Sequence, residues 1–204
     1  MIIKNSKPIL IVGYPDSSMT DEAVYFIEEE GSCVDEILTP DEFLDLKNKN
    51  YYQYFIGGMG ILHRDLTERS RICSELDNLD CISIIHDTSV IARDFKPQKG
   101  LFICPFVTVL QKSFVDRFCW IENYSLIAHY CNIGRNCIIN PGVIVGGRTT
   151  IGNNCLLRIK SAVSNKITIC DNTVVEGFSN VTKNISCPGV YVGSPARKLT
   201  RNIP

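Results

Sequence analysis

The chain has 204 residues, of which 45% are hydrophobic, and a formal net charge of −1 at pH 7. This length fits one large domain or two small ones, and the balanced charge offers no basic surface of the kind that binds nucleic acid. No apolar run reaches the roughly 20 residues of a membrane span, and the first residues lack the pattern of a secretory leader. We therefore expect a cytoplasmic protein.

Ten cysteines would indicate disulfides in a small secreted protein, but no feature of this chain indicates an oxidising compartment. The sequence contains no C-x-x-C pair. A free cysteine behaves as a compact apolar side chain. We therefore expect the cysteines to serve packing, and we predict no metal site.

The N-terminal third reads as a small α/β unit. Residues 7–13 form an apolar run that ends in a glycine and predicts a strand, and residues 21–30 predict a helix that Ser18 or Thr20 would cap. Residues 31–38 and 54–58 predict two further strands. Residues 64–76 predict a second helix, and residues 81–86 a last strand. This alternation favours βαβ units, with a boundary near residue 85.

From residue 103 to residue 181 an aliphatic residue recurs at every sixth position. The series is Ile103, Val109, Val115, Ile121, Ile127, Ile133, Ile139, Val145, Ile151, Leu157, Val163, Ile169, Val175 and Val181. A period of six fits neither an α-helix nor an amphipathic strand. It indicates a three-sided solenoid in which each aliphatic residue points inward and stacks on its equivalent about eighteen positions away. A second series, two residues earlier, contains small residues such as Cys119 and Ser125 that fit tight corners.

Segments of this repeat resemble the hexapeptide-repeat acyltransferases. The resemblance is carried by residues 125–134, 139–142 and 147–152, and by the tail that contains Gly193, Pro195 and Ala196. The chain is most similar to bacterial sugar acetyltransferases, which act on sialic acid or on nucleotide-linked 4-amino sugars. The resemblance implies a Rossmann-like α/β domain at residues 1–85 that binds a nucleotide sugar, followed by a left-handed parallel β-helix at residues 86–204.

The resemblance also assigns a catalytic base and an oxyanion donor. His129 follows the inward Ile127 by two residues and therefore lies near a corner, and its surroundings match the catalytic histidine segment of the family. Histidine titrates near neutrality and can accept a proton there. Gly147 lies one coil further on, and the resemblance implies that its backbone N–H binds the thioester oxygen. A structural interpretation, in which Gly146 and Gly147 only relax a tight corner, is compatible with this role.

Two positions depart from the family pattern. Tyr130 stands where many relatives have an acidic residue that orients the histidine, and Cys137 stands where many have a second histidine. A tyrosine donates or accepts hydrogen bonds but supplies no negative charge at neutral pH. Another group, such as a carboxylate of a neighbouring subunit, would then have to orient His129.

The resemblance implies that acetyl-CoA binds in a groove between the β-helices of a homotrimer. The matching positions are Gly147, Ile159 and Gly177, with Lys160 or Lys166 near the phosphates. Both lysines are equally compatible with solvated surface. The acceptor would attack the thioester directly, because no cysteine has a neighbouring base that would make it an acyl carrier.

The resemblance further implies a nucleotide site at the end of the first strand, with Gly13, Ser17, Asp35 and Gly57 as contacts. The turn after Gly13, at residues 14–18, departs from the glycine-rich pattern of the family. Its Asp16 would repel a phosphate. A purely structural turn without a ligand therefore remains open.

The sequence predicts an acetyl-CoA-dependent acetyltransferase that acts on the amino group of a nucleotide-linked amino sugar in bacterial surface-glycan synthesis. One alternative is an O-acetyltransferase acting on sialic acid or another free sugar. A second is a β-helix that serves as a scaffold without catalysis, because fold alone does not determine function.

Overall fold

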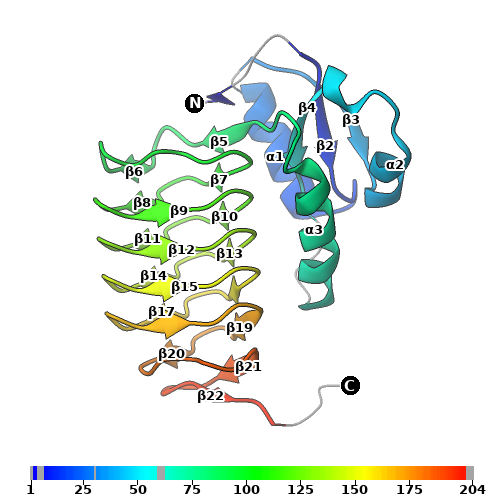
Figure 1. Ribbon diagram of the computed structural model, residues 1–204. Helices are drawn as coiled ribbons and strands as arrows, with labels where there is room; N and C mark the ends of the chain where they lie inside the picture. Colours follow the sequence, from blue (N-terminus) through cyan, green and yellow to red (C-terminus); the bar gives the residue numbers. More distant parts are fainter. Residues whose placement is uncertain (1, 4–6, 30, 59–62, 201–204) are drawn as a thin grey trace.

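The computed structural model describes residues 2–3, 7–29, 31–58 and 63–200 of the chain. An N-terminal α/β part lies against one side of a long β-solenoid (Figure 1). No helix in these ranges is long and apolar enough to cross a membrane.

The N-terminal part is built on a parallel three-stranded sheet. Its strands, in spatial order, are β3 (Val34–Leu38), β2 (Ile9–Val12) and β4 (Gln53–Ile56). The helices are α1 (Ser18–Glu29), α2 (Pro40–Asp45) and α3 (His63–Leu76), with a 3-10 turn at Lys49–Tyr51. The three predicted strands and both predicted helices are confirmed.

Two details of the N-terminal part differ from the prediction. Helix α1 begins at Ser18, and the carbonyl of Ser17 accepts the N–H groups of Thr20 and Asp21 at 2.8 and 3.1 Å. The predicted caps Ser18 and Thr20 therefore lie inside the helix, and that prediction is wrong. The short helix α2 was not predicted, although it starts with a capping box formed by Thr39 and Glu42.

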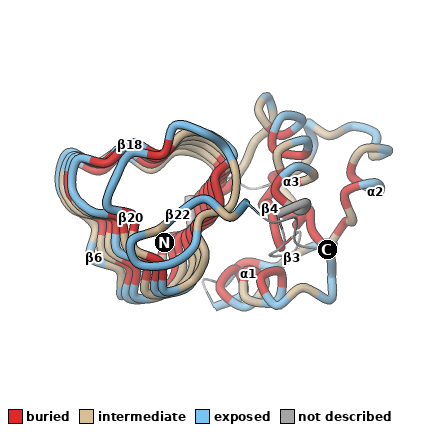
Figure 2. The backbone as a smooth tube through the Cα atoms, turned by 90° about the horizontal axis from the view of Figure 1, so that it is seen from below, coloured by how far each residue is buried: buried red, intermediate tan, exposed pale blue. Residues whose placement is uncertain are grey.

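The solenoid has three sheets, one for each side (Figure 2). The first sheet contains β5 (Ser83–Ile85), β7 (Phe102–Ile103), β10 (Trp120–Ile121), β13 (Ile138–Ile139), β16 (Leu156–Leu157), β19 (Thr173–Val175), β21 (Gly189–Val192) and β22 (Arg197–Lys198), with β1 (Ile2–Ile3) paired to β5. The second contains β6 (Val90–Ile91), β8 (Thr108–Val109), β11 (Leu126–Ile127), β14 (Ile144–Val145), β17 (Ala162–Val163) and β20 (Asn180–Val181). The third contains β9 (Phe114–Val115), β12 (Asn132–Ile133), β15 (Thr150–Ile151) and β18 (Thr168–Ile169).

The six-residue period is confirmed as the period of the fold. Each predicted inward residue from Ile103 to Val181 belongs to a strand and is at most 2% exposed. Equivalent residues stack eighteen positions apart, as in the pairings of Ile121 with Ile139 and of Ile127 with Val145. The fold is a β-solenoid of the left-handed β-helix type.

Strands β7, β10, β13, β16 and β19 of the first sheet are buried on both faces, on the side where the N-terminal part lies. The outward residues Phe102 and Trp120 of this sheet are fully buried, and their rings contact the ring of Phe55 on β4, with centroids 5.6 and 6.1 Å away. On the other two sheets the corresponding residues, such as Phe114 and Ile144, are exposed. The corners of the solenoid next to the second and third sheets are therefore open to a ligand or a partner.

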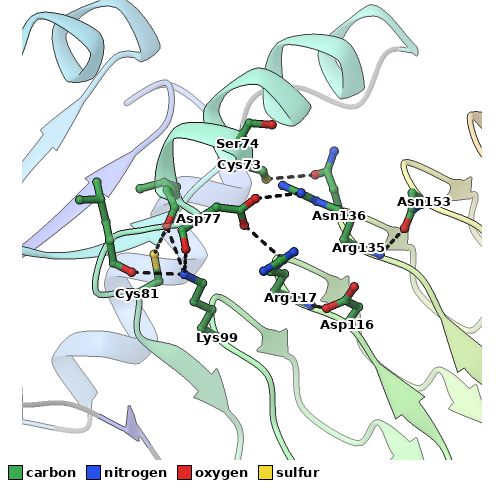
Figure 3. Close-up of polar contacts among 12 residues, drawn as sticks. Cys73, Ser74, Asp77, Cys81, Lys99, Asp116, Arg117, Arg135, Asn136 and Asn153 are labelled. Atoms are coloured by element: carbon green, nitrogen blue, oxygen red, sulfur yellow. Dashed lines mark hydrogen bonds and ion pairs between the residues drawn. The ribbon is translucent and has the colours of Figure 1, made fainter.

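Helix α3 is fastened to the solenoid by buried polar contacts. Arg69 is 2% exposed; its Nη1 donates to the carbonyl of Phe118 at 2.8 Å and also to Asn136 Oδ1. After the end of the helix, Asp77 pairs with Arg117 at 3.2 Å and with Arg135 at 2.9 Å (Figure 3). These contacts fix the N-terminal part on the first sheet.

Candidate active site

His129 lies at a corner of the solenoid, between β11 and β12. The inward Ile127 anchors the strand before it, and Tyr130 takes a positive φ of 59° that turns the chain. The imidazole is half-buried rather than sealed in the core. The sequence-based placement of His129 at an open corner is thus the placement that the structure shows.

The imidazole of His129 packs against Gly147 of the next coil. A Cβ atom added to Gly147 would lie 2.8 Å from His129 Cε1 and 2.9 Å from its Nε2, closer than side-chain contacts allow. Strands β11 and β14 are in register, which places residue 147 directly beside residue 129. The missing side chain of Gly147 therefore makes room for the histidine ring.

The second ring nitrogen of His129 has no partner among the described residues. Its Nδ1 atom is buried without a hydrogen bond, a rare situation for a polar atom. The ring of Tyr130 stands edge-on to the imidazole with centroids 5.6 Å apart, and the Arg148 guanidinium lies 5.2 Å from the Tyr130 centroid. The pair of Tyr130 and Arg148 thus stands at the position where an acidic residue would orient the imidazole. This pair supplies no hydrogen-bond acceptor for Nδ1 of His129.

The amide of Gly147 is not free in this structure. Its N–H donates to Asn165 Oδ1 at 2.8 Å. Asn165 lies one further coil along the same corner, eighteen residues after Gly147. The predicted role of this amide as an oxyanion donor would require that hydrogen bond to break first.

The other two cofactor candidates lie at a different corner. Ile159 and Gly177 are stacked on one another between the first and second sheets, and a Cβ atom on Gly177 would be 3.2 Å from Ile159. They line a cleft of about 450 Å³ between the solenoid and the start of α1. Its lining residues are Ser18, Met19, Glu122, Asn140, Arg158, Ile159, Glu176, Gly177 and Phe178.

The floor of this cleft is a polar column. Glu122, Asn140, Arg158 and Glu176 follow one another at intervals of eighteen residues. Asn140 Nδ2 donates to Glu122 Oε1 at 2.7 Å, and Arg158 Nε lies 3.4 Å from Glu176 Oε1. Burial raises the pKa of Glu122 to about 7, an effect that the hydrogen bond from Asn140 partly opposes and that the charge of Glu22 increases.

Three of the four predicted nucleotide contacts meet at one edge of the N-terminal sheet. A Cβ atom on Gly13 would lie 3.1 Å from the backbone of Gly57, and a Cβ atom on Gly58 would overlap with Ser17 Oγ. This is the edge where β2 and β4 end and α1 begins, and parallel sheets usually bind ligands there. Asp35 does not belong to this cluster: its Oδ2 accepts the N–H of Ile9 at 2.7 Å, at the opposite end of β2.

The predicted residues therefore form two groups. The first group contains the sheet edge, Ile159 and Gly177. Ser17 of the sheet edge is next to Ser18, and Ser18 lines the same cleft as Ile159 and Gly177, so these residues lie on one side of the molecule. The corner that carries His129 and Gly147 lies between the sides labelled β18 and β6 in Figure 2, facing away from the N-terminal part. Lys166 is exposed on the His129 corner, and Lys160 is exposed beside the cleft, 5.9 Å from the Phe178 centroid.

Two sets of residues in these regions were not predicted from the sequence. Asn165 continues the column of His129 and Gly147, and Glu122 begins the column that ends at Glu176. Both columns could have been found by reading the sequence at intervals of eighteen residues. What that reading cannot supply is which side-chain atoms face each other.

Comparison with known proteins gives a consistent result. No protein-family profile matches the chain. A GDP-perosamine N-acetyltransferase of Escherichia coli O157:H7 is 28% identical over 144 residues, which cover 69% of this chain. The match spans 63% of that relative's length.

Solved structures share the fold over almost the whole chain. PerB from Caulobacter crescentus, in complex with CoA and GDP-perosamine, has a TM-score of 0.81 at 16% identity and covers 95% of this chain and 97% of its own. The acetyltransferase domain of PglB from Neisseria gonorrhoeae has a TM-score of 0.76 at 14% identity, and covers 95% of this chain and 100% of its own. The resemblance to hexapeptide-repeat sugar acetyltransferases is confirmed, in sequence by the first relative and in fold by the other two.

Proposed function

We propose that this chain is an acetyl-CoA-dependent N-acetyltransferase that modifies the amino group of a nucleotide-linked amino sugar, in the synthesis of bacterial surface glycans. One observation carries the proposal: the imidazole of His129 is held against Gly147 on an open corner of the solenoid. The similarity in sequence to a GDP-perosamine N-acetyltransferase supports the substrate class.

The chemistry needs one base and no acyl-enzyme. The sugar amine attacks the thioester carbonyl, so that a C–N bond forms and the carbonyl oxygen becomes an oxyanion. His129 Nε2 takes a proton from the attacking nitrogen, and the C–S bond then breaks. The departing CoA sulfur takes the proton from the imidazolium, which restores the neutral base. A base of this kind is typically worth about 10²–10⁴ in rate.

The two substrates would bind on the side of the cleft. We assign the nucleotide to the sheet edge formed by Gly13, Ser17 and Gly57, in an N-terminal Rossmann-like domain that ends near residue 85. We assign acetyl-CoA to the backbone around Ile159 and Gly177, with its thioester directed toward Gly147 of a neighbouring chain. Asp35 is left out of this assignment because its carboxylate is engaged at the other end of β2.

This assignment needs more than one chain. His129 and the cleft lie at different corners of the same solenoid, so one molecule does not place the base beside its own cleft. A ring in which the His129 corner of one chain meets the cleft of the next would join them, and the resemblance makes that ring a homotrimer. The unpartnered Nδ1 of His129 supports a site completed by a neighbouring chain.

The test is a product assay with purified enzyme, acetyl-CoA and a panel of acceptors. The panel compares nucleotide-linked amino sugars, beginning with GDP-perosamine, with free sialic acid and free amino sugars. The acetylated product is quantified by chromatography and mass spectrometry, because the exposed Cys33 and Cys187 would react with thiol reagents for CoA. We expect N-acetylation of one nucleotide-linked amino sugar, and a loss of kcat by at least about 10²-fold in His129→Asn.

The same panel decides between the alternatives. O-acetylation of a free sugar would replace the proposed acceptor. Absence of any transfer by a correctly folded protein would favour a scaffold. Turnover that is unchanged in His129→Asn would remove this residue from the mechanism.

A further inference from the structure

Three consecutive backbone amides at the corner beside His129, from Gly146 to Arg148, are already engaged in hydrogen bonds. The N–H groups of Gly146, Gly147 and Arg148 donate to the carbonyl of Val163, to Asn165 Oδ1 and to the carbonyl of His129, at 2.8, 2.8 and 2.9 Å. None of these three amides, that of Gly147 included, is free to stabilise negative charge that develops on a carbonyl oxygen, so a side-chain donor at this glycine is the alternative.

Asn165 presents such a donor in a fixed orientation. A backbone N–H only donates, so the side-chain atom that faces Gly147 N must be the oxygen Oδ1. The amide nitrogen Nδ2 is then directed away from that bond, with two N–H groups. Among the described residues none accepts a hydrogen bond from it.

The equivalent side chains at another corner have no such spare donor. Asn153 Oδ1 accepts the N–H of Arg135, and Asp171 Oδ1 accepts the N–H of Asn153. There the column continues, because Asn153 Nδ2 donates to Asp171 Oδ2 at 3.2 Å. In the column of Asn165 the next residue is Lys183, whose side chain has no acceptor. The cap at Asn153 thus leaves no amide donor unused, whereas the cap at Asn165 leaves one beside Gly147.

The base and this donor meet at one glycine. His129 packs against the α-carbon of Gly147 from the preceding coil, and Asn165 binds the nitrogen of Gly147 from the following coil. We propose that the side-chain amide of Asn165, rather than the backbone N–H of Gly147, donates to the thioester oxygen in the transition state. This inference rests on the proposed acetyl transfer.

In this step the C–N bond forms while the carbonyl electron pair moves onto oxygen, and Asn165 Nδ2 holds that oxyanion. The electron pair returns when the C–S bond breaks, so the amide loses no proton and the step needs no other reactant. The hydrogen bond to Gly147 keeps the amide aligned before substrate arrives, which is what makes such a donor effective.

Asn165→Asp separates this role from a purely structural one. A carboxylate still accepts the N–H of Gly147, so the corner keeps its cap, but the donor is lost. Ser164→Asp is the matched control, because it adds the same charge at the adjacent exposed residue and leaves Asn165 in place. Thermal unfolding shows whether both variants keep the stability of the parent protein.

The decisive measurement uses acetyl-CoA alone, without an acceptor. Calorimetry gives its Kd, and isotope-edited infrared spectroscopy of [1-¹³C]acetyl-CoA gives the carbonyl stretch in the bound state. We expect the carbonyl stretching frequency of acetyl-CoA to fall when it binds to the parent protein or to Ser164→Asp. In Asn165→Asp this frequency should return toward that of free acetyl-CoA. In turnover, Asn165→Asp should lower kcat by about 10²–10³-fold with little change in KM for acetyl-CoA.

The outcomes distinguish this inference from the function on which it rests. The role of Asn165 would be overturned if Asn165→Asp kept both the lowered carbonyl stretching frequency and the full kcat. If His129→Asn lost activity in the same experiments, the proposed function would still stand. If the parent protein does not bind acetyl-CoA, both the function and the role of Asn165 are overturned.

Discussion

Gly146 and Gly147 are adjacent glycines that meet different kinds of atoms. The three atoms nearest to a Cβ atom on Gly147 would all belong to the movable ring of His129, whereas a Cβ atom on Gly146 would lie 2.7 Å from the backbone nitrogen of Asn165 and 2.8 Å from the backbone carbon of Ser164. A side chain can rotate away, but the packed backbone of the next coil cannot. A substitution at Gly147 should therefore affect catalysis, and a substitution at Gly146 should affect the stability of the fold.

We predict opposite effects for alanine at these two positions. Gly147→Ala should displace the imidazole and lower kcat by about 10²-fold, because misplacing a catalytic group by about 1 Å has that effect. Its free energy of unfolding should change little. Gly146→Ala should lower that free energy by about 1–3 kcal/mol through overpacking. Equal losses of stability in both variants, measured by chemical denaturation, would contradict this reading of the corner.

Glu122 makes the stability of the protein depend on pH. Burial raises its pKa from 4.5 to about 7, so the folded state holds this proton over a range in which the unfolded chain releases it. The contribution of Glu122 to the free energy of unfolding therefore decreases as pH rises from about 4.5 to 7, and stays low above that range.

Glu122→Gln should remove this dependence. We expect the variant to gain stability relative to the parent protein between pH 5 and 8, by on the order of 1–3 kcal/mol. Denaturation at a series of pH values measures the difference directly. A difference that is constant across this range would show that Glu122 is ionised alike in the folded and unfolded states.

At the scale of elements, the hexad repeat predicted all the strands from β7 to β20. The repeat reflects which residues point into the core, and not the conformational preference of each single residue. Local preference would have failed at the corners, where non-glycine residues such as Phe106, Lys112 and Arg148 take positive φ values near 60°. These conformations cost about 1–2 kcal/mol each in isolation. Stacking of successive coils imposes them, so the period is informative where single residues are not.

The polar contacts could not be predicted in the same way. The pairing of His129 with Gly147 follows from an offset of eighteen residues, but the bond from Gly147 to Asn165 depends on a side-chain rotamer. The attachment of α3 depends on contacts across 49 and 67 residues of sequence, from Arg69 to Phe118 and to Asn136. No local pattern reports separations of that size.

Arg69 provides the test of how α3 is attached. Arg69→Ala should lower the free energy of unfolding by about 3–5 kcal/mol, because it removes a buried charged donor and leaves acceptors unpaired. Arg71→Ala is the control on the same helix: Arg71 is exposed, and its pair with the exposed Asp41 at 3.5 Å should contribute at most about 1 kcal/mol. Similar values for the two variants in urea denaturation would mean that Arg69 does not anchor the helix.

At the scale of the whole molecule, the division of the candidate site is the feature that the sequence did not reveal. Sequence offsets relate residues within one corner, but they do not say that Gly147 and Ile159 face different directions. The fold shows that the base and the cleft lie at different corners. Under the proposed function, a complete site is therefore one to which neighbouring chains contribute different parts.

Mixed oligomers test this claim most directly. His129→Ala removes the base, and Ser18→Trp fills the cleft from the exposed start of α1, so each variant alone should be inactive. Co-expression of the two variants should restore activity, because random mixing of chains pairs an intact His129 with an intact cleft at about a quarter of the interfaces. Acetyl transfer by the co-expressed protein, at about that fraction of the parent rate, is the result that we predict. Mixed oligomers that assemble but remain as inactive as either variant alone would contradict a site shared between chains.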